Sequence, residues 1–137
     1  MDECMYFKFQ VKCYIPPTAP LETIMVEYKD GVWHGYKYGE LAFTKEPRDM
    51  SDFWEKIDAL EIWNWERFYE RVRPVYTYMW ELEMDNGNLK NMISMGLESY
   101  PPGVRIEESI AFQRFIEMLT DYIGYEDFFE MILLYED

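Results

Sequence analysis

The chain of 137 residues is strongly acidic, with 27 Asp and Glu against 13 Lys and Arg and a formal net charge of −14. Its residues are 49% hydrophobic and 19% aromatic, which supplies one well-filled core and excludes disorder. The excess of carboxylates argues against direct binding of nucleic acid phosphates and of anionic membranes. We therefore expect one domain over residues 1–137.

The first expected element is a half-buried strand over residues 5–14. Apolar and polar side chains alternate along it with the period of a strand. The apolar positions are Phe7, Phe9, Val11 and Cys13, and the polar positions are Lys8, Gln10 and Lys12. Three prolines within residues 15–20 then remove backbone donors and end the strand.

Residues 23–28 and 32–38 predict a hairpin that turns at Asp30-Gly31. A three-residue loop with Gly31 in the left-handed region would keep the apolar residues of both strands on one face. It pairs Ile24, Val26 and Tyr28 with Tyr38, Tyr36 and His34. We expect His34 to be half-buried, with its polar atoms satisfied, and packed against these tyrosines.

Residues 49–60 change to the period of a short helix, which Asp49 or Ser51 caps. Its apolar side chains share one face: Phe53, Trp54, Ile57 and Leu60. Residues 62–69 follow as an aromatic connector with no assigned structure.

A second hairpin is predicted around Asn86-Gly87, the strongest signal for a two-residue type I′ turn. That turn pairs the inward residues Met84, Leu82, Trp80 and Tyr78 with Leu89, Asn91, Ile93 and Met95, and pairs Glu83 with Lys90 on the outer face. Glu81, Glu83 and Asp85 are then expected on the outer face of one strand.

Residues 109–123 predict a helix with a broad apolar stripe, ended by Gly124, and residues 126–135 predict a final short helix. The expected fold class is α+β. An antiparallel sheet of about five strands, in two hairpin-containing halves, carries two or three helices packed on one face.

The residues that could carry catalysis are few. Cys4 and Cys13 lie on or beside one extended strand, so roughly 30 Å would separate them, and we expect two free thiols. These thiols and the single histidine make no zinc set, and no glycine-rich loop precedes a helix. We therefore expect a non-enzymatic protein with no catalytic residue, no metal and no cofactor.

The acidic start of the chain, Asp2 and Glu3, is unlike a secretory signal, and no apolar run reaches the 18 residues of a membrane span. With two reduced cysteines, this pattern favours a cytoplasmic protein. The sequence leaves the oligomeric state open between a monomer and a small homo-oligomer.

The second half of the chain resembles a group of small bacterial and phage proteins of unassigned function. The residues that carry the resemblance are a Trp-x-Leu-x-aliphatic strand at Trp80 to Met84, a turn at Asn86-Gly87, and Gly96 followed by Tyr100-Pro101 before the helix. Glu98 and Ser99 depart from the small or amide residues expected there. The resemblance implies a fold and no chemistry.

The charge is the remaining clue to function. An acidic face studded with Tyr and Trp can dock onto a basic protein surface such as a nucleic-acid groove. We therefore expect an inhibitor of a basic nucleic-acid-processing protein, of phage anti-defence (anti-CRISPR-like) or toxin-immunity type. The expected partner-binding residues are Glu66, Glu70, Glu81, Glu83 and Asp85. The alternatives are a solubilising surface without a partner, and a small-ligand domain with an aromatic and Met-lined pocket near His34.

Overall fold

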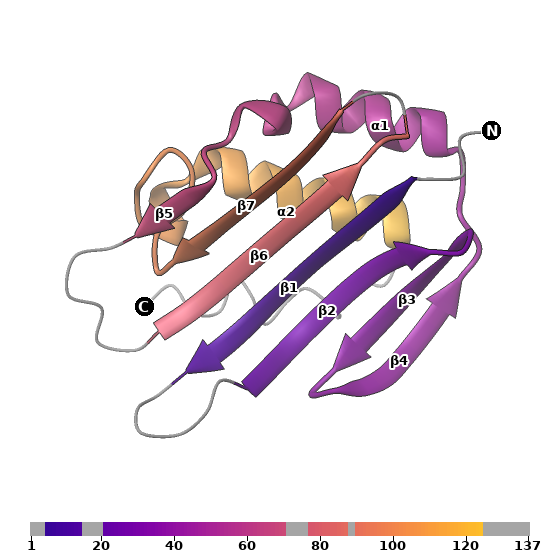
Figure 1. Cartoon of the computed structure of the whole chain (residues 1–137), viewed down its shortest axis with the longest axis horizontal. Helices are drawn as coiled ribbons and strands as arrows, with labels where there is room; N and C mark the ends of the chain where they lie inside the picture. The colour runs from indigo at the N-terminus through magenta and orange to yellow at the C-terminus, as the bar shows by residue number, and fades with distance from the viewer. Residues whose placement is uncertain (1–4, 15–20, 71–76, 88–89, 125–137) are drawn as a thin grey trace.

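The computed structural model describes residues 5–14, 21–70, 77–87 and 90–124. In this part of the chain, seven strands form one sheet with two α-helices beside it (Figure 1). The strands are β1 (Tyr6–Tyr14), β2 (Leu21–Lys29), β3 (Val32–Lys37), β4 (Glu40–Lys45), β5 (Phe68–Glu70), β6 (Thr77–Asp85) and β7 (Asn91–Leu97). The helices are α1 (Met50–Ala59) and α2 (Ile110–Ile123), with short 3₁₀ turns at Ile62–Asn64 and Ile106–Glu108.

The strand order across the sheet is β4-β3-β2-β1-β6-β7-β5. Neighbours pair antiparallel except β5, which runs parallel to β7. The prediction of about five antiparallel strands is therefore wrong in two respects. It lacked β4, which follows the tight turn at Tyr38-Gly39, and it lacked β5, which lies inside the aromatic connector.

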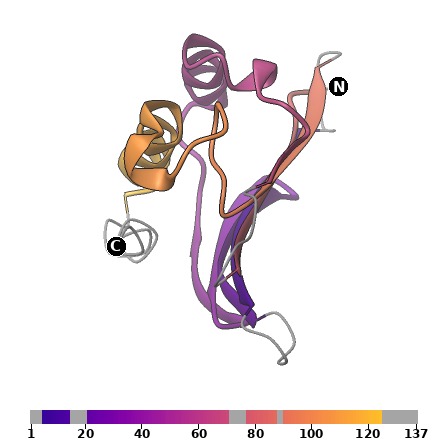
Figure 2. The same ribbon diagram turned by 90° about the vertical axis from the view of Figure 1, so that its left-hand side faces the viewer.

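Both helices pack on one face of the sheet, here called the inner face (Figure 2). Alternation along each strand sends one set of side chains toward the helices and the other set to the opposite side, here called the outer face. In the described residues, no helix covers the outer face. The α+β class and the helices on one face are thus as predicted, while the helix expected at residues 126–135 lies outside the described residues.

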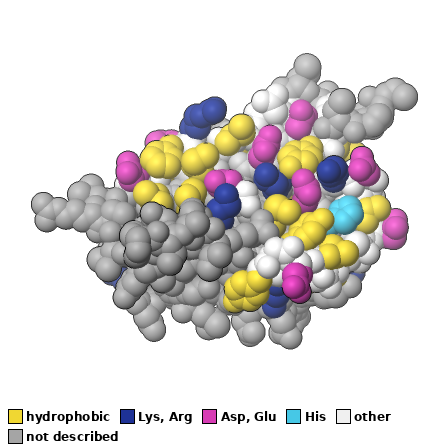
Figure 3. Space-filling view, turned by 60° about the horizontal axis from the view of Figure 1, so that its bottom comes forward, with side chains coloured by type: hydrophobic (Ala, Val, Ile, Leu, Met, Phe, Trp, Pro, Cys, Tyr) yellow, Lys and Arg dark blue, Asp and Glu magenta, His cyan; other side chains and the backbone are white. Residues whose placement is uncertain are grey.

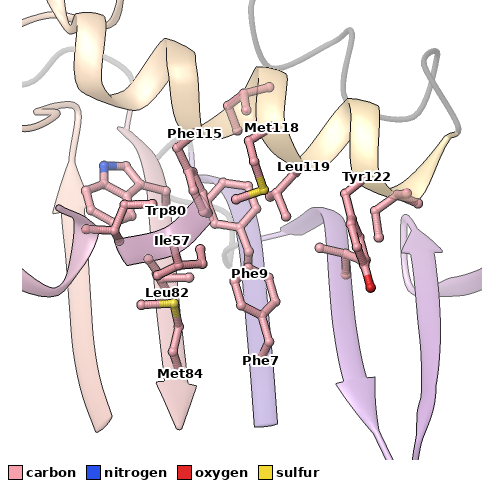
Figure 4. Packing of buried hydrophobic residues seen from close by; sticks show 14 of the residues in the cluster. Phe7, Phe9, Ile57, Trp80, Leu82, Met84, Phe115, Met118, Leu119 and Tyr122 are labelled. Carbon is pink, nitrogen blue, oxygen red and sulfur yellow. The ribbon is translucent and has the colours of Figure 1, made fainter. Parts of the chain in front are cut away.

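The core is a slab of aromatic and aliphatic side chains between the inner face and α2 (Figure 4). Phe7 and Phe9 of β1 and Leu82 and Met84 of β6 point to the helix side of the sheet, where Ile57 of α1 and Phe115 of α2 lie. Rings meet edge to face, as in the pair of Phe9 and Phe115, whose centroids are 5.2 Å apart. This confirms the inward series predicted for residues 7–11 and 80–84.

Side chains cap both helix starts, with Asp49 as predicted for the first helix and Ser109 at the residue where the second helix was predicted to begin. Asp49 accepts the backbone N–H of Ser51 at 2.9 Å, and Ser109 Oγ accepts that of Phe112 at 3.1 Å. Gly124 ends α2 with a φ of 89°, in the left-handed region that favours glycine. The sequence therefore located both helices to within about a residue.

The first hairpin has a different register from the one predicted. Asp30 and Gly31, with φ of 56° and 80°, form a two-residue turn that pairs Tyr28 with Trp33 and Val26 with Gly35. Trp33 and Gly35 therefore face the core and His34 faces outward. The ring of Phe43 from β4 fills the inward space at Gly35. It lies so close that a Cβ added to Gly35 would be 2.1 Å from the ring.

The second hairpin is also shifted from its predicted register. Five residues connect β6 to β7, and β6 pairs so that Leu82 lies opposite Ser94 and Trp80 opposite Gly96. The prediction that Ile93 and Met95 face the core is therefore wrong. Ser94 and Gly96 take the inward places, and the bulk of Trp80 fills the space that a larger residue would need.

Candidate functional site on the outer face of the sheet

The register shift of β7 creates an apolar strip on the outer face. It consists of Phe68 of β5 and Ile93, Met95 and Leu97 of β7. Phe68 and Ile93 keep 46% and 39% of their surface exposed, and the other two are half-buried. Sequence reasoning missed this strip, although the small residues Ser94 and Gly96 between large ones were the signal for it.

Acidic side chains border the strip on both sides. Glu81 lies across from Met95 and Glu83 lies across from Ile93, both on β6. On the other side, Glu70 of β5 lies beside Leu97. We call the four apolar residues together with Glu70, Glu81 and Glu83 the acid-rimmed strip. Figure 3 shows hydrophobic, acidic and basic side chains interspersed over the exposed surface, with the histidine among them.

The expected partner-binding carboxylates have unequal surroundings. Glu81 accepts a hydrogen bond from Gln10 Nε2 at 2.7 Å and lies 3.9 Å from Lys12 Nζ, so part of its charge is compensated locally. Asp85 accepts the backbone N–H of Gly87 at 2.8 Å. In the described part of the chain, Glu83 has neither an ion pair nor a hydrogen bond. Of the three carboxylates on β6, Glu83 is therefore the one most available to a partner.

Glu66 and Glu70 flank the other border, in and before β5. Both side chains are exposed. Glu66 holds its segment in place through its backbone, since its carbonyl accepts from Ser94 Oγ and its N–H donates to Tyr69 Oη at 2.8 Å. Glu70 thus belongs to the acid-rimmed strip, and Glu66 lies in the segment that leads into it.

A cavity of about 280 Å³ lies at the end of the strip nearest the β6–β7 loop. Its lining residues come from three neighbouring strands: Tyr6, Glu83, Met84, Asp85, Asn91, Met92 and Ile93. Tyr6 Oη donates to Glu27 Oε2 at 2.8 Å. Burial first, and then this hydrogen bond to a carboxylate, raise the pKa of the Tyr6 phenol, so the ring is neutral at physiological pH.

His34 lies on the outer face, opposite Glu27 and away from the core. Its ring stacks on Tyr36 with centroids 6.5 Å apart, which confirms the predicted aromatic contact. The prediction that its polar atoms are satisfied is wrong for Nδ1, which is buried and has no hydrogen-bond partner among the residues that the structure describes. His34 is not among the residues that line the cavity.

The described ranges hold neither a grouped set of metal ligands nor a membrane-spanning helix. Those ranges contain no group of three or more His, Cys, Asp or Glu side chains placed to hold a metal ion. They also contain no helix of the length and apolarity needed to cross a membrane. Cys4 lies outside the described residues, so the prediction of two free thiols stays a prediction.

Comparison with known proteins gives no further assignment. No protein family, no curated protein and no solved structure matches the chain. The resemblance of Trp80 to Met84 and Gly96 to Pro101 to a group of small bacterial and phage proteins therefore stays a prediction.

Proposed function

We propose that the protein is a non-enzymatic binding module that docks its acid-rimmed strip onto a basic protein. The single observation that carries this proposal is the combination of exposed Phe68 and Ile93 with carboxylates on both sides. Stable interfaces commonly have an apolar centre inside a polar rim, and a rim of one charge selects partners of the opposite charge.

The overall charge supports the same kind of partner. A net charge of −14 on 137 residues attracts basic proteins over the Debye length, which is about 10 Å at 0.1 M salt. The most strongly basic protein surfaces are those that bind nucleic acid phosphates. The proposed function is therefore inhibition of a basic nucleic-acid-processing protein by occupying its nucleic-acid groove.

Two biological settings fit an acidic inhibitor of this kind. One is phage anti-defence, including anti-CRISPR-like antagonism, and the other is immunity against a basic toxin. Both place the protein in the cytoplasm with its target, and both need a partner whose binding site for nucleic acid is blocked. Identification of the partner distinguishes the two.

The second candidate function is binding of a small ligand near His34. The buried Nδ1 atom of His34, which lacks a hydrogen-bond partner, is the observation that favours it. The cavity of about 280 Å³ lies at the β6–β7 end of the sheet, however, and His34 does not line it. The acid-rimmed strip therefore supports protein binding better than this atom supports a ligand site.

The proposal is tested by capturing partners from a lysate of the native host and identifying them by mass spectrometry. The purified partner is then bound in the presence of increasing nucleic acid. The proposal predicts a basic partner that nucleic acid displaces. An acidic partner, or binding that nucleic acid leaves unchanged, contradicts it.

A further inference from the structure

The cavity at the end of the acid-rimmed strip combines charged and apolar walls. Two adjacent sets of paired residues line it on the outer face. In the first set, Asp85 of β6 lies between Tyr6 of β1 and Asn91 of β7, and in the second set Glu83 of β6 lies opposite Ile93 of β7. Ile93 supplies the apolar side chain on this face, whereas Met84 and Met92 border the cavity from the pair of residues that alternates toward the inner face. The cavity thus presents two carboxylates, one amide and a neutral phenol around a partly apolar space.

We propose that this cavity receives one arginine side chain of the basic partner. The inference rests on the proposed function and specifies the anchor residue that the partner supplies. The Ile93 side chain suits the apolar stem of arginine, and the carboxylates of Glu83 and Asp85 suit its guanidinium group. The uncompensated charge of Glu83 provides the main attraction.

The geometry favours arginine over lysine. Glu83 and Asp85 are two residues apart on one strand, so their Cα atoms are about 7 Å apart and their side chains lie on the same face. A planar guanidinium has five N–H donors and can reach both carboxylates, whereas an ammonium is a compact point charge. The ring of Tyr6 adds a surface on which a guanidinium can stack.

The size of the cavity matches a single long side chain. Pockets for drug-sized ligands usually measure about 300 to 1,000 Å³ and enclose most of the ligand. The cavity of about 280 Å³ lies at the lower end of that scale and has room for one long side chain that enters from a docked surface. Central, well-packed arginines are frequent hot spots of protein interfaces.

Lys8 is a cation of this chain that lies beside Glu83 and opposes the binding of an arginine there. Lys8 of β1 lies between Glu27 and Glu83 in the register of the sheet, although it forms no ion pair with Glu83. Its ammonium lies beside Glu83 in the sheet and repels an incoming guanidinium, which weakens the attraction. We therefore expect Lys8→Gln to bind the arginine probe more tightly than the wild type does.

The test uses the full chain with ¹³C-labelled Met and Ile methyl groups, titrated with N-acetyl-arginine N-methylamide. We expect the signals of Met92 and Ile93 to shift and saturate, and the neutral citrulline analogue to leave them unchanged. Glu83→Gln should weaken the arginine affinity about tenfold or more, because it removes a charge-assisted hydrogen bond. Glu117→Gln, an exposed glutamate on α2, should leave the affinity unchanged.

Three results would overturn the inference: unshifted methyl signals, equal shifts with citrulline, or shifts that depend on protein concentration alone. The last result would assign the cavity to contact between two copies of the chain. The proposed function has its own readout. A basic partner displaced by nucleic acid but insensitive to Glu83→Gln refutes the arginine cavity alone, whereas saturable arginine binding without such a partner refutes the proposed function alone.

Discussion

Gly96 is the residue at which the packing of β7 leaves least room. A Cβ there would lie 2.1 Å from Trp80 Nε1 and 2.2 Å from the carbonyl oxygen of Ser99. Trp80 Nε1 donates to that same carbonyl at 2.9 Å, so the added atom would displace a buried hydrogen bond as well as a ring. This glycine therefore supports both the core and the course of β7.

Gly96→Ala should lower the free energy of unfolding by about 3 kcal/mol, since overpacking and a lost buried hydrogen bond act together. Urea denaturation measures the change. Gly39→Ala is the matched control, because no atom lies within 4 Å of its added Cβ and only its φ of 82° is unfavourable. The control should lose about 1 kcal/mol. Equal losses in the two variants would contradict the close approach of Trp80.

Tyr6 makes stability depend on pH in the alkaline range. Burial and the hydrogen bond to Glu27 raise the pKa of its phenol in the folded state above the unfolded value of 10.0. Above pH 10 the unfolded chain has lost this proton and the folded chain keeps it, so the free energy of unfolding falls as pH rises. Tyr6→Phe should remove part of that fall, as measured by urea denaturation at pH 9 to 11. An unchanged slope in the variant would refute the assignment.

Among the structural elements, the two helix caps differ in burial, and they should differ in how much each contributes to the free energy of unfolding. Ser109 is fully buried, and its hydroxyl accepts from Phe112 N–H and donates to the carbonyl of Pro101. Asp49 is exposed and only caps α1. We expect Ser109→Ala to lower the free energy of unfolding by about 2 kcal/mol and Asp49→Ala by about 1 kcal/mol. A larger loss for Asp49→Ala in chemical denaturation would contradict this order.

Helices and strands with strong periodicity were predictable, and hairpin registers were not. The cap at Asp49, the helix start at Ser109, the helix end at Gly124 and the alternation of β1 and β6 are local signals that the structure confirms. Both register errors have one cause: a glycine takes an inward place, and an aromatic ring from the next strand fills it. Gly35 lies beneath Phe43 and Gly96 lies beneath Trp80. The hydrophobic period of one strand does not show that an aromatic ring from a neighbouring strand will fill the space at a glycine.

The candidate site was predictable only in its acidic half. Glu81, Glu83 and Asp85 were assigned to one outward strand face by alternation, and the structure places them there. The apolar half was assigned to the core, because Ile93 and Met95 are large and hydrophobic. Their outward direction follows from the inward packing of Ser94 and Gly96, which required the three-dimensional register.

In the molecule as a whole, substitutions on the two faces of the sheet should have different effects, on stability for the inner face and on binding for the outer face. The inner face and the helices form the aromatic core, so substitutions there act on stability. The outer face carries the acid-rimmed strip, where exposed carboxylates contribute little to folding and some repel one another. Charge reversal on the outer face should therefore change binding and leave the melting temperature nearly unchanged.

We propose that the acid-rimmed strip docks onto a basic partner by electrostatic attraction. The most direct test of this proposal measures the association rate constant with the captured partner between about 0.1 and 1 M salt, over which the Debye length falls from about 10 to about 3 Å. Glu70→Lys/Glu83→Lys is compared with Glu108→Lys/Glu117→Lys, a pair of exposed glutamates away from the strip that changes the net charge equally.

We expect the association of the wild type to slow steeply with salt while its dissociation changes less. The strip variant should associate more slowly at low salt and lose most of the salt dependence, and the control variant should stay close to the wild type. Equal effects of the two double variants would show that only total charge matters, and binding that is insensitive to salt and to both variants would contradict docking through the acid-rimmed strip.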